Sequence, residues 1–303
     1  SVGNISWGGS GKTPLCTWLL DWALSRHNKP ALISRGYKAS PPAYPHLVKP
    51  WDDAHKSGDE PLMLSSSCPE ADIIIDPERK RAAKWAAQNL APDLFILDDG
   101  FQHLKVKRDI DLVLIRPQDL NKDLNEIIPL GSWREGKTAL KRASAFLINV
   151  DPDQFHELEK KLKRRLSIFS RPIFSFYLDI RSLIRVKDEV QLPLAHAGDY
   201  MLVTAVGDPA KVINSTQKAL GHAPLKQLIY PDHHGFSARD WKYICSQADK
   251  LGCKKVLCTP KDAVKLKSFA DYRLCTFELY LEFGPYLFSS NNFPEWLEKE
   301  LIS

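Results

Sequence analysis

A glycine-rich segment near the N-terminus constrains the fold of this chain more than any other stretch. It covers residues 8–13 and reads GGSGKT, with a short apolar stretch before it and a helix-forming stretch after it. Glycines so closely spaced let successive backbone N–H groups turn inward at a helix N-terminus, where they surround an anion. The phosphate-loop pattern G-x-x-x-x-G-K-[ST] is met except at its first glycine, where Ser6 stands. We predict a phosphate-binding loop rather than a flexible turn.

This loop supplies the first candidate site residues. In a phosphate loop the lysine reaches the β- and γ-phosphates, and the hydroxyl that follows it helps to hold Mg²⁺. The predicted nucleotide-binding residues are Gly8, Gly9, Ser10, Gly11, Lys12 and Thr13.

A pair of aspartates ends a later apolar stretch. The sequence LFILDDGFQH runs from a buried strand straight into Asp98 and Asp99. Two adjacent carboxylates at the carboxyl end of a strand are costly unless a cation satisfies them, and Mg²⁺ takes such ligands. A single aspartate before Gly100 would instead indicate a turn. With the glycine loop in the same chain, we interpret the pair as part of a metal site.

Short apolar stretches alternate with amphipathic ones from residue 1 to about residue 150. The pattern predicts helices over 14–24 and 78–88, and strands over 31–34, 71–75, 94–97, 110–115 and 143–150. Strands that are apolar throughout and alternate with helices are typical of a parallel sheet covered on both faces. Ligands of such sheets bind beyond the carboxyl ends of the strands.

The rest of the chain resumes this alternation after an interruption. A basic helix is predicted over 153–169, the extended stretch PIFSFYLDIRSLIRV follows, and a second alternating series begins at Tyr200. A chain of 303 residues exceeds the usual size of one core. We predict an α/β fold in which a P-loop parallel-sheet domain and a second, smaller α/β domain are joined by extended strap strands. The predicted boundaries are 1–168 for the first domain, 169–199 for the linker and 200–303 for the domain that closes the cleft.

Composition excludes several classes of protein. Hydrophobic residues make up 44% and charged residues 26%, as in ordinary soluble globular proteins. The net charge of +5 suits an anionic partner without naming one. No apolar run approaches the length of a transmembrane helix, and the six cysteines include no C-x-x-C pair, which disfavours a zinc site. Few residues precede the glycine loop, so we expect an upstream segment, missing from this chain, that carries the membrane anchor.

Four further motifs are ambiguous when each is taken alone. SGDEP at 57–61 reads as a turn or a helix start, SRGY at 34–37 is equally open, and a histidine in a loop such as YPDHHGF at 230–236 is more often at the surface than catalytic. TPKD at 259–262 is informative by exclusion. Its lysine and aspartate are adjacent, unlike those of the guanine-specific N-K-x-D motif, so a GTPase is disfavoured.

Taken together and in order, these motifs resemble those of the tetraacyldisaccharide 4'-kinase family. The resemblance rests on VGNIS, GGSGKTP, SRGY, GDEP, DDGFQH, GDP, PDHH and TPKD, and it covers nearly the whole chain. It implies an ATP- and Mg²⁺-dependent kinase that phosphorylates the 4'-hydroxyl of a tetraacylated glucosamine disaccharide 1-phosphate in lipid A biosynthesis. It also implies a peripheral protein at the cytoplasmic face of the bacterial inner membrane, where the lipid substrate lies, with no nucleic-acid partner.

The resemblance further implies a role for each motif residue. Asp59 of GDEP and His233 of PDHH form a catalytic dyad, and Lys12 completes the catalytic set. Transfer to a sugar hydroxyl needs a base for the alcohol proton, a task that suits an aspartate held by a histidine. Because His233 lies in the second half of the chain, the dyad would form across a cleft and couple chemistry to domain closure. The predicted metal residues are Thr13, Asp98, Asp99 and Glu60, and the predicted substrate or phosphate residues are Arg79, Arg134, Glu135 and His103.

The sequence departs from the family pattern in two places. The family's apolar N-terminal segment, which contacts the membrane, is missing, and the family's L-R-E-P stretch appears as WREG at 133–136, without its proline. Basic contacts with anionic headgroups are expected at Lys137, Lys141 and Arg142. The basic run at 160–165 fits a solvated helix face at least as well.

Two alternatives remain open at this point. A P-loop kinase for a soluble sugar or nucleoside would act without detergent and would be indifferent to acyl chains. A nucleotide-gated binding module, such as a regulator or a metal-insertion protein, would need no base, so replacing Asp59 by alanine would leave its ATP turnover unchanged.

Overall fold

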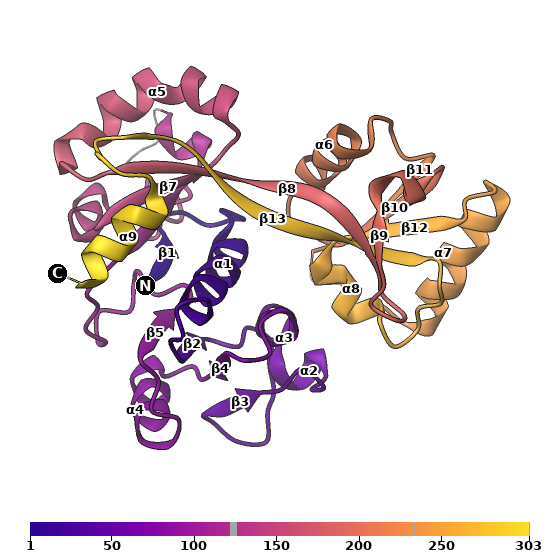
Figure 1. Cartoon of the computed structure of the whole chain (residues 1–303), viewed down its shortest axis with the longest axis horizontal. Helices are drawn as coiled ribbons and strands as arrows, with labels where there is room; N and C mark the ends of the chain where they lie inside the picture. Colours follow the sequence, from indigo (N-terminus) through magenta and orange to yellow (C-terminus); the bar gives the residue numbers. More distant parts are fainter. Residues whose placement is uncertain (122–125, 233, 303) are drawn as a thin grey trace.

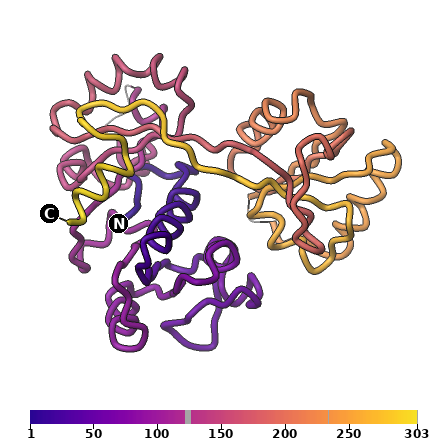
Figure 2. The backbone as a smooth tube through the Cα atoms, in the orientation of Figure 1, coloured from indigo at the N-terminus to yellow at the C-terminus, as the bar shows by residue number. Residues whose placement is uncertain are grey.

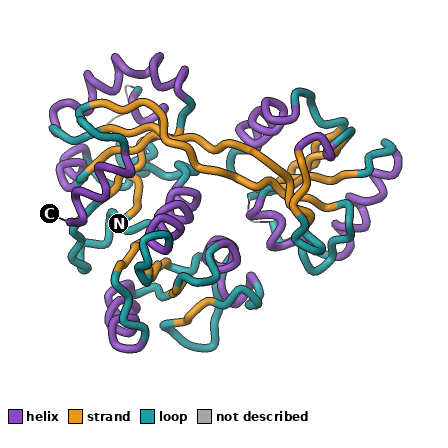
Figure 3. The backbone as a smooth tube through the Cα atoms, in the orientation of Figure 1, coloured by secondary structure: helices purple, strands orange, loops and turns teal. Residues whose placement is uncertain are grey.

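The computed structural model describes residues 1–121, 126–232 and 234–302. Its strands are β1 (Val2–Asn4), β2 (Pro30–Ser34), β3 (His46–Val48), β4 (Asp72–Ile75), β5 (Leu94–Leu97), β6 (Leu112–Ile115), β7 (Ala145–Asn149), β8 (Ile173–Arg185), β9 (Gln191–Pro193), β10 (Tyr200–Thr204), β11 (Lys226–Ile229), β12 (Lys255–Cys258) and β13 (Leu274–Leu287). In the described residues they form two sheets, one ordered β1-β6-β7-β8-β13-β12-β10-β11 with β9 beside β8, the other ordered β3-β4-β2-β5 (Figures 1 and 3).

Helices connect these strands. The α-helices are α1 (Lys12–Leu24), α2 (Ala54–Ser57), α3 (Asp59–Ser67), α4 (Arg79–Asn89), α5 (Pro152–Leu166), α6 (Pro209–Leu220), α7 (Ala238–Lys250), α8 (Pro260–Leu266) and α9 (Phe293–Ile302). Short 3₁₀ helices are η1 (Pro117–Leu120), η2 (Lys137–Arg142), η3 (Ser167–Phe169) and η4 (Leu194–Ala197). Among the described residues, no helix has both the length and the apolar character that crossing a membrane requires.

The part of the molecule that carries the glycine loop consists of mainly parallel strands covered by helices. We call it the N-terminal body: strands β1 to β7 with helices α1 to α5. Strands β1, β6, β7 and β8 pair in parallel, as do β4, β2 and β5. A bridge between Val2 and Asp98 joins the two sheets at the carboxyl end of β5. Buried Leu15, Leu32 and Leu114 share one core cluster, so α1 covers the sheet beside the loop. The predicted α/β fold with a parallel sheet is confirmed.

Most predicted elements of this body lie within two residues of their observed bounds. The strand over 94–97 is β5 itself, and the helix expected over 14–24 begins two residues earlier, at Lys12. Strand β3 was not predicted. It pairs antiparallel with β4 at the edge of the smaller sheet, where a strand needs no continuous apolar pattern.

Two long antiparallel strands, β8 and β13, connect this body to a second one (Figure 1). Strand β8 pairs with β7 at its beginning and with β9 at its end, while β13 pairs with β12 before it runs back along β8. The predicted extended strap therefore exists as β8, but its partner comes from about a hundred residues further along the chain. The predicted domain boundaries stay a prediction.

The second body, which we call the C-terminal body, is built on β10, β11 and β12 with α6, α7 and α8. Its three strands are parallel, with β10 between the other two. Met201, Val203 and Val256 lie in a core cluster of their own. Figure 2 shows that the chain enters this body along β8 and leaves it along the neighbouring β13.

The last helix does not stay with the C-terminal body. Phe293, Trp296 and Leu297 of α9 belong to the core cluster of α1, and the Phe293 ring centroid lies 5.7 Å from that of Trp18. The predicted boundaries, which stay a prediction, place 200–303 in the smaller domain, whereas β13 carries the chain back toward α1 before α9 begins. The apolar face of α9 is thus buried on the N-terminal body.

Candidate active site

The glycine loop between β1 and α1 adopts a backbone that only glycine tolerates well at two positions. Gly8 has φ +113° and Gly11 has φ +93°. A Cβ atom would lie 2.5 Å from Arg116 Nη1 at the first position and 2.6 Å from Asn149 Nδ2 at the second. At Gly9 a Cβ would meet nothing within 4 Å. Two of the loop glycines are therefore required by backbone conformation and close packing.

Ser6, which replaces the first glycine of the pattern, fixes the start of the loop. It is fully buried, and its Oγ donates a hydrogen bond of 2.7 Å to Asp119 Oδ2 in η1. The side chain of Asn4 in turn donates to the Ser6 carbonyl. The departure from the pattern thus supplies an anchor between the loop and η1.

Ser10 has an unused polar atom inside the loop. Its side chain is 5% exposed, and its Oγ meets no hydrogen-bond partner among the described residues. A buried hydroxyl without a partner is costly. In a loop of this shape the missing partner fits an anionic ligand such as a phosphate.

Lys12 connects the loop to the acidic pair. Its Nζ donates to Asn4 Oδ1 at 3.1 Å and lies 3.5 Å from Asp99 Oδ1. Asp99 also accepts a 2.7 Å hydrogen bond from Arg134 Nη1. Burial by itself would raise the pKa of Asp99, but the cations of Lys12 and Arg134 outweigh it, so the pKa of this carboxyl lies below its usual value. Asp99 is therefore held as a carboxylate.

Asp98 behaves differently from its neighbour. It is 8% exposed and accepts a 2.9 Å hydrogen bond from Ser34 Oγ. Burial, with the nearby charge of Glu60 adding to it, raises the pKa of Asp98 to about 6. Two neighbouring carboxyl groups whose pKa values are shifted in opposite directions are typical of a functional site. Ser34 belongs to SRGY, so that motif contributes to the acidic site.

Asp59 and Glu60 begin α3, directly after Gly58, which has φ +81°. Glu60 accepts a 3.2 Å hydrogen bond from Thr13 Oγ1, which ties α3 to the first turn of α1. From the C-terminal body, Lys261 Nζ lies 3.7 Å from Glu60 Oε1, and Lys265 Nζ lies 3.9 Å from Asp59 Oδ2. GDEP and the glycine loop are therefore neighbours, as a shared site requires.

The predicted dyad is described only in part. His233 lies outside the described residues, so its relation to Asp59 stays a prediction. The preceding residue, Asp232, is described: its Oδ1 lies 3.4 Å from Lys261 Nζ, the same ammonium that faces Glu60. The PDHH loop thus reaches the neighbourhood of GDEP through a residue that the structure does describe.

The four predicted substrate residues differ in their burial and in their contacts with the acidic pair. Arg134 lies at the site, on Asp99, with its guanidinium 5.5 Å from the Trp7 ring. Glu135 is engaged by Arg142, whose Nη2 donates to Glu135 Oε1 at 2.8 Å. Of the four, Arg134 is the residue whose side chain contacts the acidic pair, through its ion pair with Asp99.

Arg79 is buried and His103 is half-buried. Arg79 is 3% exposed, donates to the Asp76 carbonyl at 3.0 Å, and burial lowers its pKa. Burial, reinforced by the charge of Arg79, also lowers the pKa of His103. Both residues belong to the electrostatic surroundings of Asp98 and Asp99 rather than to an open surface.

The acidic residues suit a magnesium ion that shares its ligands with a nucleotide. Among the described residues, no group of three or more His, Cys, Asp or Glu side chains is arranged to hold a metal ion. Mg²⁺ is usually bound through one or two carboxylates together with phosphate oxygens and waters, so a full protein cage is not required. The repulsion that Glu60 exerts on Asp98 is what a divalent cation would offset.

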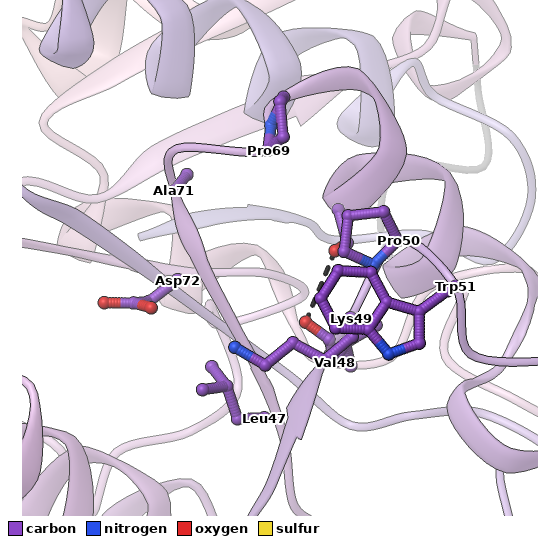
Figure 4. A pocket seen from close by; sticks show the side chains of 9 residues that line it. Leu47, Val48, Lys49, Pro50, Trp51, Pro69, Ala71 and Asp72 are labelled. Carbon is purple, nitrogen blue, oxygen red and sulfur yellow. Dashed lines mark hydrogen bonds between the residues drawn. The ribbon is translucent and has the colours of Figure 1, made fainter.

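A hollow elsewhere in the N-terminal body is not this site. It has a volume of about 160 Å³ and is lined by residues around β3 and the start of β4, among them Val48, Pro50, Trp51, Pro69 and Asp72 (Figure 4). It contains none of the predicted site residues.

Comparison with known proteins identifies the family. The family model described as "Tetraacyldisaccharide-1-P 4'-kinase" matches residues 1–301. This chain belongs to that kinase family.

Individual members of this kinase family match over most of their length. The tetraacyldisaccharide 4'-kinase of Nitratidesulfovibrio vulgaris is 44% identical over 99% of this chain and 83% of the relative. The enzyme of the same name from Aeromonas hydrophila is 32% identical over 89% of this chain and 73% of the relative. A crystal structure of LpxK from Aquifex aeolicus, described as in complex with ATP, has a TM-score of 0.75 at 24% identity and covers 99% of this chain and 86% of that one. At this identity the likeness shows the shared fold.

Sequence reasoning missed several residues of this kinase site. Asn4 contacts Lys12 of the loop, Ser34 contacts Asp98, and Gln102 accepts a hydrogen bond from Arg134. Lys261 and Lys265 of α8 face the acidic start of α3. TPKD disfavours a GTPase and contributes to the family resemblance, but the motif alone assigns its lysine no role. A signal was nevertheless present, because lysines four residues apart after a helix-start motif lie on one helix face. The sequence could not show that these lysines face Asp59 and Glu60, because those carboxylates lie about two hundred residues earlier in the chain.

Proposed function

We propose that this chain transfers the γ-phosphate of ATP to the 4'-hydroxyl of a tetraacylated glucosamine disaccharide 1-phosphate, the reaction that gives its family its name. The observation that supports the proposal most directly is that the glycine loop contacts two acidic pairs, Asp98 with Asp99 and Asp59 with Glu60. Lys12 contacts Asp99, and Thr13 contacts Glu60 beside Asp59. A phosphate cradle, metal-side acids and a candidate base are what phosphoryl transfer to an alcohol needs.

The loop binds and orients the nucleotide in this proposal. Backbone N–H groups of residues 8–13 surround the phosphates, and Ser10 Oγ donates to one of them. Lys12 neutralises charge on the β- and γ-phosphates, a role supported by its position between Asn4 and Asp99. Thr13, Glu60, Asp98 and Asp99 hold Mg²⁺, which supplies positive charge at the phosphate oxygens when it is bound.

Asp59 accepts the proton of the 4'-hydroxyl, with His233 as its partner. Its place in the first turn of α3, one residue from Glu60, supports this role, because the base is then within one residue of the metal-side acids. Arg134 contributes positive charge next to Asp99 and suits an anionic group of the nucleotide or of the sugar 1-phosphate. Arg79 adds positive charge near Asp98 and Asp99, and His103 lies near Arg79 and Asp99. Glu135 is engaged by Arg142.

The test is a transfer assay with ATP, Mg²⁺ and lipid disaccharide 1-phosphate in detergent micelles. We expect 4'-phosphorylated lipid with the natural chain and a loss of kcat of about 10²-fold or more for Asp59→Ala, the size typical of general-base removal. His233→Ala should cost a similar factor, and the double variant should lose no more than about the larger single loss, because a dyad acts as a unit. Transfer to soluble sugars with none to the lipid would contradict the proposal.

We also propose that the protein contacts the cytoplasmic face of the inner membrane beside this site. Trp7, Ile127, Ile128 and Leu130 are exposed apolar side chains, and Leu130 is 85% exposed. They belong together, because Trp7 N donates to the Ser132 carbonyl and Ile127 forms a β-bridge with Trp133. Basic residues follow at Lys137 and Lys141, a combination that suits an anionic bilayer.

Co-sedimentation with phosphatidylglycerol vesicles tests this contact. Leu130→Asp should weaken binding several-fold, because it puts a carboxylate where an apolar side chain meets the lipid. The control is Leu225→Asp on the C-terminal body, where the native side chain is also exposed, at 51%. Equal binding by both variants would exclude this surface.

A further inference from the structure

Helix α8 presents two cations to the acidic start of α3. Lys261 and Lys265 lie one helical turn apart, and their ammonium groups face two successive carboxylates: Lys261 lies 3.7 Å from Glu60, and Lys265 lies 3.9 Å from Asp59. The two helices belong to different bodies and meet where these bodies approach each other (Figure 1). Two ion pairs rather than one therefore join α8 to the start of α3.

Lys265 is the buried member of the pair. Its side chain is 5% exposed, and its Nζ lies 3.2 Å from Asp262 Oδ1 as well as near Asp59. No atom of the described residues completes a hydrogen bond to Nζ. The ammonium also lies 5.4 Å from the centre of the Phe236 ring. A cation this deeply buried requires compensating charge, and here the charge comes from both bodies at once.

Asp262 fixes the inner side of this arrangement. It is fully buried, and its Oδ2 accepts hydrogen bonds from Ala205 N at 3.1 Å and from Thr259 Oγ1 at 2.7 Å. These contacts tie the start of α8 to the end of β10. Lys265 is therefore held by its own body and pointed at the carboxylate of the other.

Packing sets the distance between the helices. Val264, next to Lys265, packs against the core cluster of the N-terminal body that includes Leu62 and Leu64 of α3. The approach of Lys265 to Asp59 thus follows from a hydrophobic contact and does not depend on the charges alone.

We infer that Lys265 is a positioning residue that holds the Asp59 carboxylate in the orientation needed to accept the substrate proton. The inference rests on the proposed function of Asp59. A buried ammonium on one side of a carboxylate restricts its rotation, and small misplacements of a reacting group cost large factors in rate. Because Lys265 belongs to the C-terminal body, Asp59 is oriented only when α8 is docked on α3.

The test compares Lys265→Met with Lys265→Arg in the complete chain. We expect the methionine variant to lose kcat about 10- to 100-fold, with the KM for ATP changed less than threefold, since the nucleotide loop belongs to the other body. The arginine variant should recover part of kcat because it restores the cation. Lys267→Met is the control: that lysine is 58% exposed and pairs with Glu189, so its kcat should match the natural chain.

A second variant separates positioning from folding. In Lys265→Met alone, Asp262 loses its counter-charge, which would lower stability. The double variant Asp262→Asn with Lys265→Met removes both charges and should regain thermal stability while kcat stays low. Recovery of kcat in the double variant, or an unchanged kcat in Lys265→Met, would overturn the inference. Failure of the natural chain to phosphorylate the lipid would instead overturn the proposed function, so the two failures are distinguishable.

Discussion

At the scale of single residues, the sequence was enough to predict the phosphate loop, but it could not explain why Ser6 replaces the first glycine of the pattern. Gly11 could be recognised from the pattern, and its φ of +93° explains why the pattern demands it. Ser6 could only be noted as a departure, because its partner Asp119 lies more than a hundred residues away. The opposite pKa shifts of Asp98 and Asp99 could not be predicted from the sequence either, since burial and Glu60 raise the pKa of Asp98 while Lys12 and Arg134 lower that of Asp99.

Gly11→Ala should destabilise the folded chain. The added Cβ would lie 2.6 Å from Asn149 Nδ2 and 3.0 Å from the Phe176 ring, at a backbone angle that alanine avoids. We expect a loss of about 1–3 kcal/mol in the free energy of unfolding, measured by urea denaturation without nucleotide. Gly9→Ala is the matched control, because open space surrounds that position. Equal losses for both variants would contradict this account of the loop.

At the scale of elements, predictions succeeded where one pattern defines one segment and failed where two distant segments define each other. The strand over 94–97 follows from its own apolar residues. By contrast, the pairing of α3 with α8 depends on side chains from both helices, and neither GDEP nor TPKD names its partner. The short α2 is a similar case, because Asp52 before it accepts hydrogen bonds from Lys56 Nζ at 2.7 Å and Ser57 Oγ at 2.9 Å, with His46 Nε2 of β3 at 2.8 Å.

Asp52→Asn should reduce stability in a pH-dependent way. Burial would raise the pKa of Asp52, but hydrogen bonds from Lys56 and His46 outweigh it, so its pKa is lowered in the folded chain. A lowered carboxyl pKa contributes stability above the unfolded value of about 4, and this contribution is lost as pH falls below that value. We expect the variant to be less stable by about 1–3 kcal/mol at pH 7 and the gap to narrow at about pH 3.

The measurement is chemical denaturation of both proteins at several pH values. Glu70→Gln serves as control, because Glu70 is an exposed carboxylate of the same region. A gap that does not change between neutral and acidic pH would mean that the charge of Asp52 is not what stabilises β3 and α2.

At the scale of the whole molecule, the sequence predicted two α/β parts and an extended connection but not how the chain returns. The alternation of apolar and helical stretches made both parts visible. Strand β13 could not be predicted as the partner of β8, because the paired residues are about a hundred positions apart in the sequence. The docking of α9 on α1 could not be read for the same reason, although Phe293 and Trp296 are large apolar residues in a short helix.

Phe293→Ala should destabilise the N-terminal body although the residue lies near the C-terminus. Phe293 is fully buried, with its ring centroid 4.6 Å from that of Phe283 and 5.3 Å from that of Phe174. We expect a loss of about 3–5 kcal/mol in the free energy of unfolding, the range for truncating a buried aromatic side chain. Leu301→Ala, on the same helix but 42% exposed, should cost less than about 1 kcal/mol. Urea denaturation followed by circular dichroism compares the two, and a small loss for Phe293→Ala would show that α9 is not part of this core.

The position of α9 has a consequence for how the protein is made. A ribosome releases the glycine loop and α1 long before α9, yet the two helices share one core. The core of the N-terminal body therefore remains without α9 while the C-terminal body is synthesised between β8 and β13. A nascent chain stalled before residue 293 would expose the face of α1 that α9 covers, so the core of the N-terminal body is completed only after the C-terminal body has been synthesised.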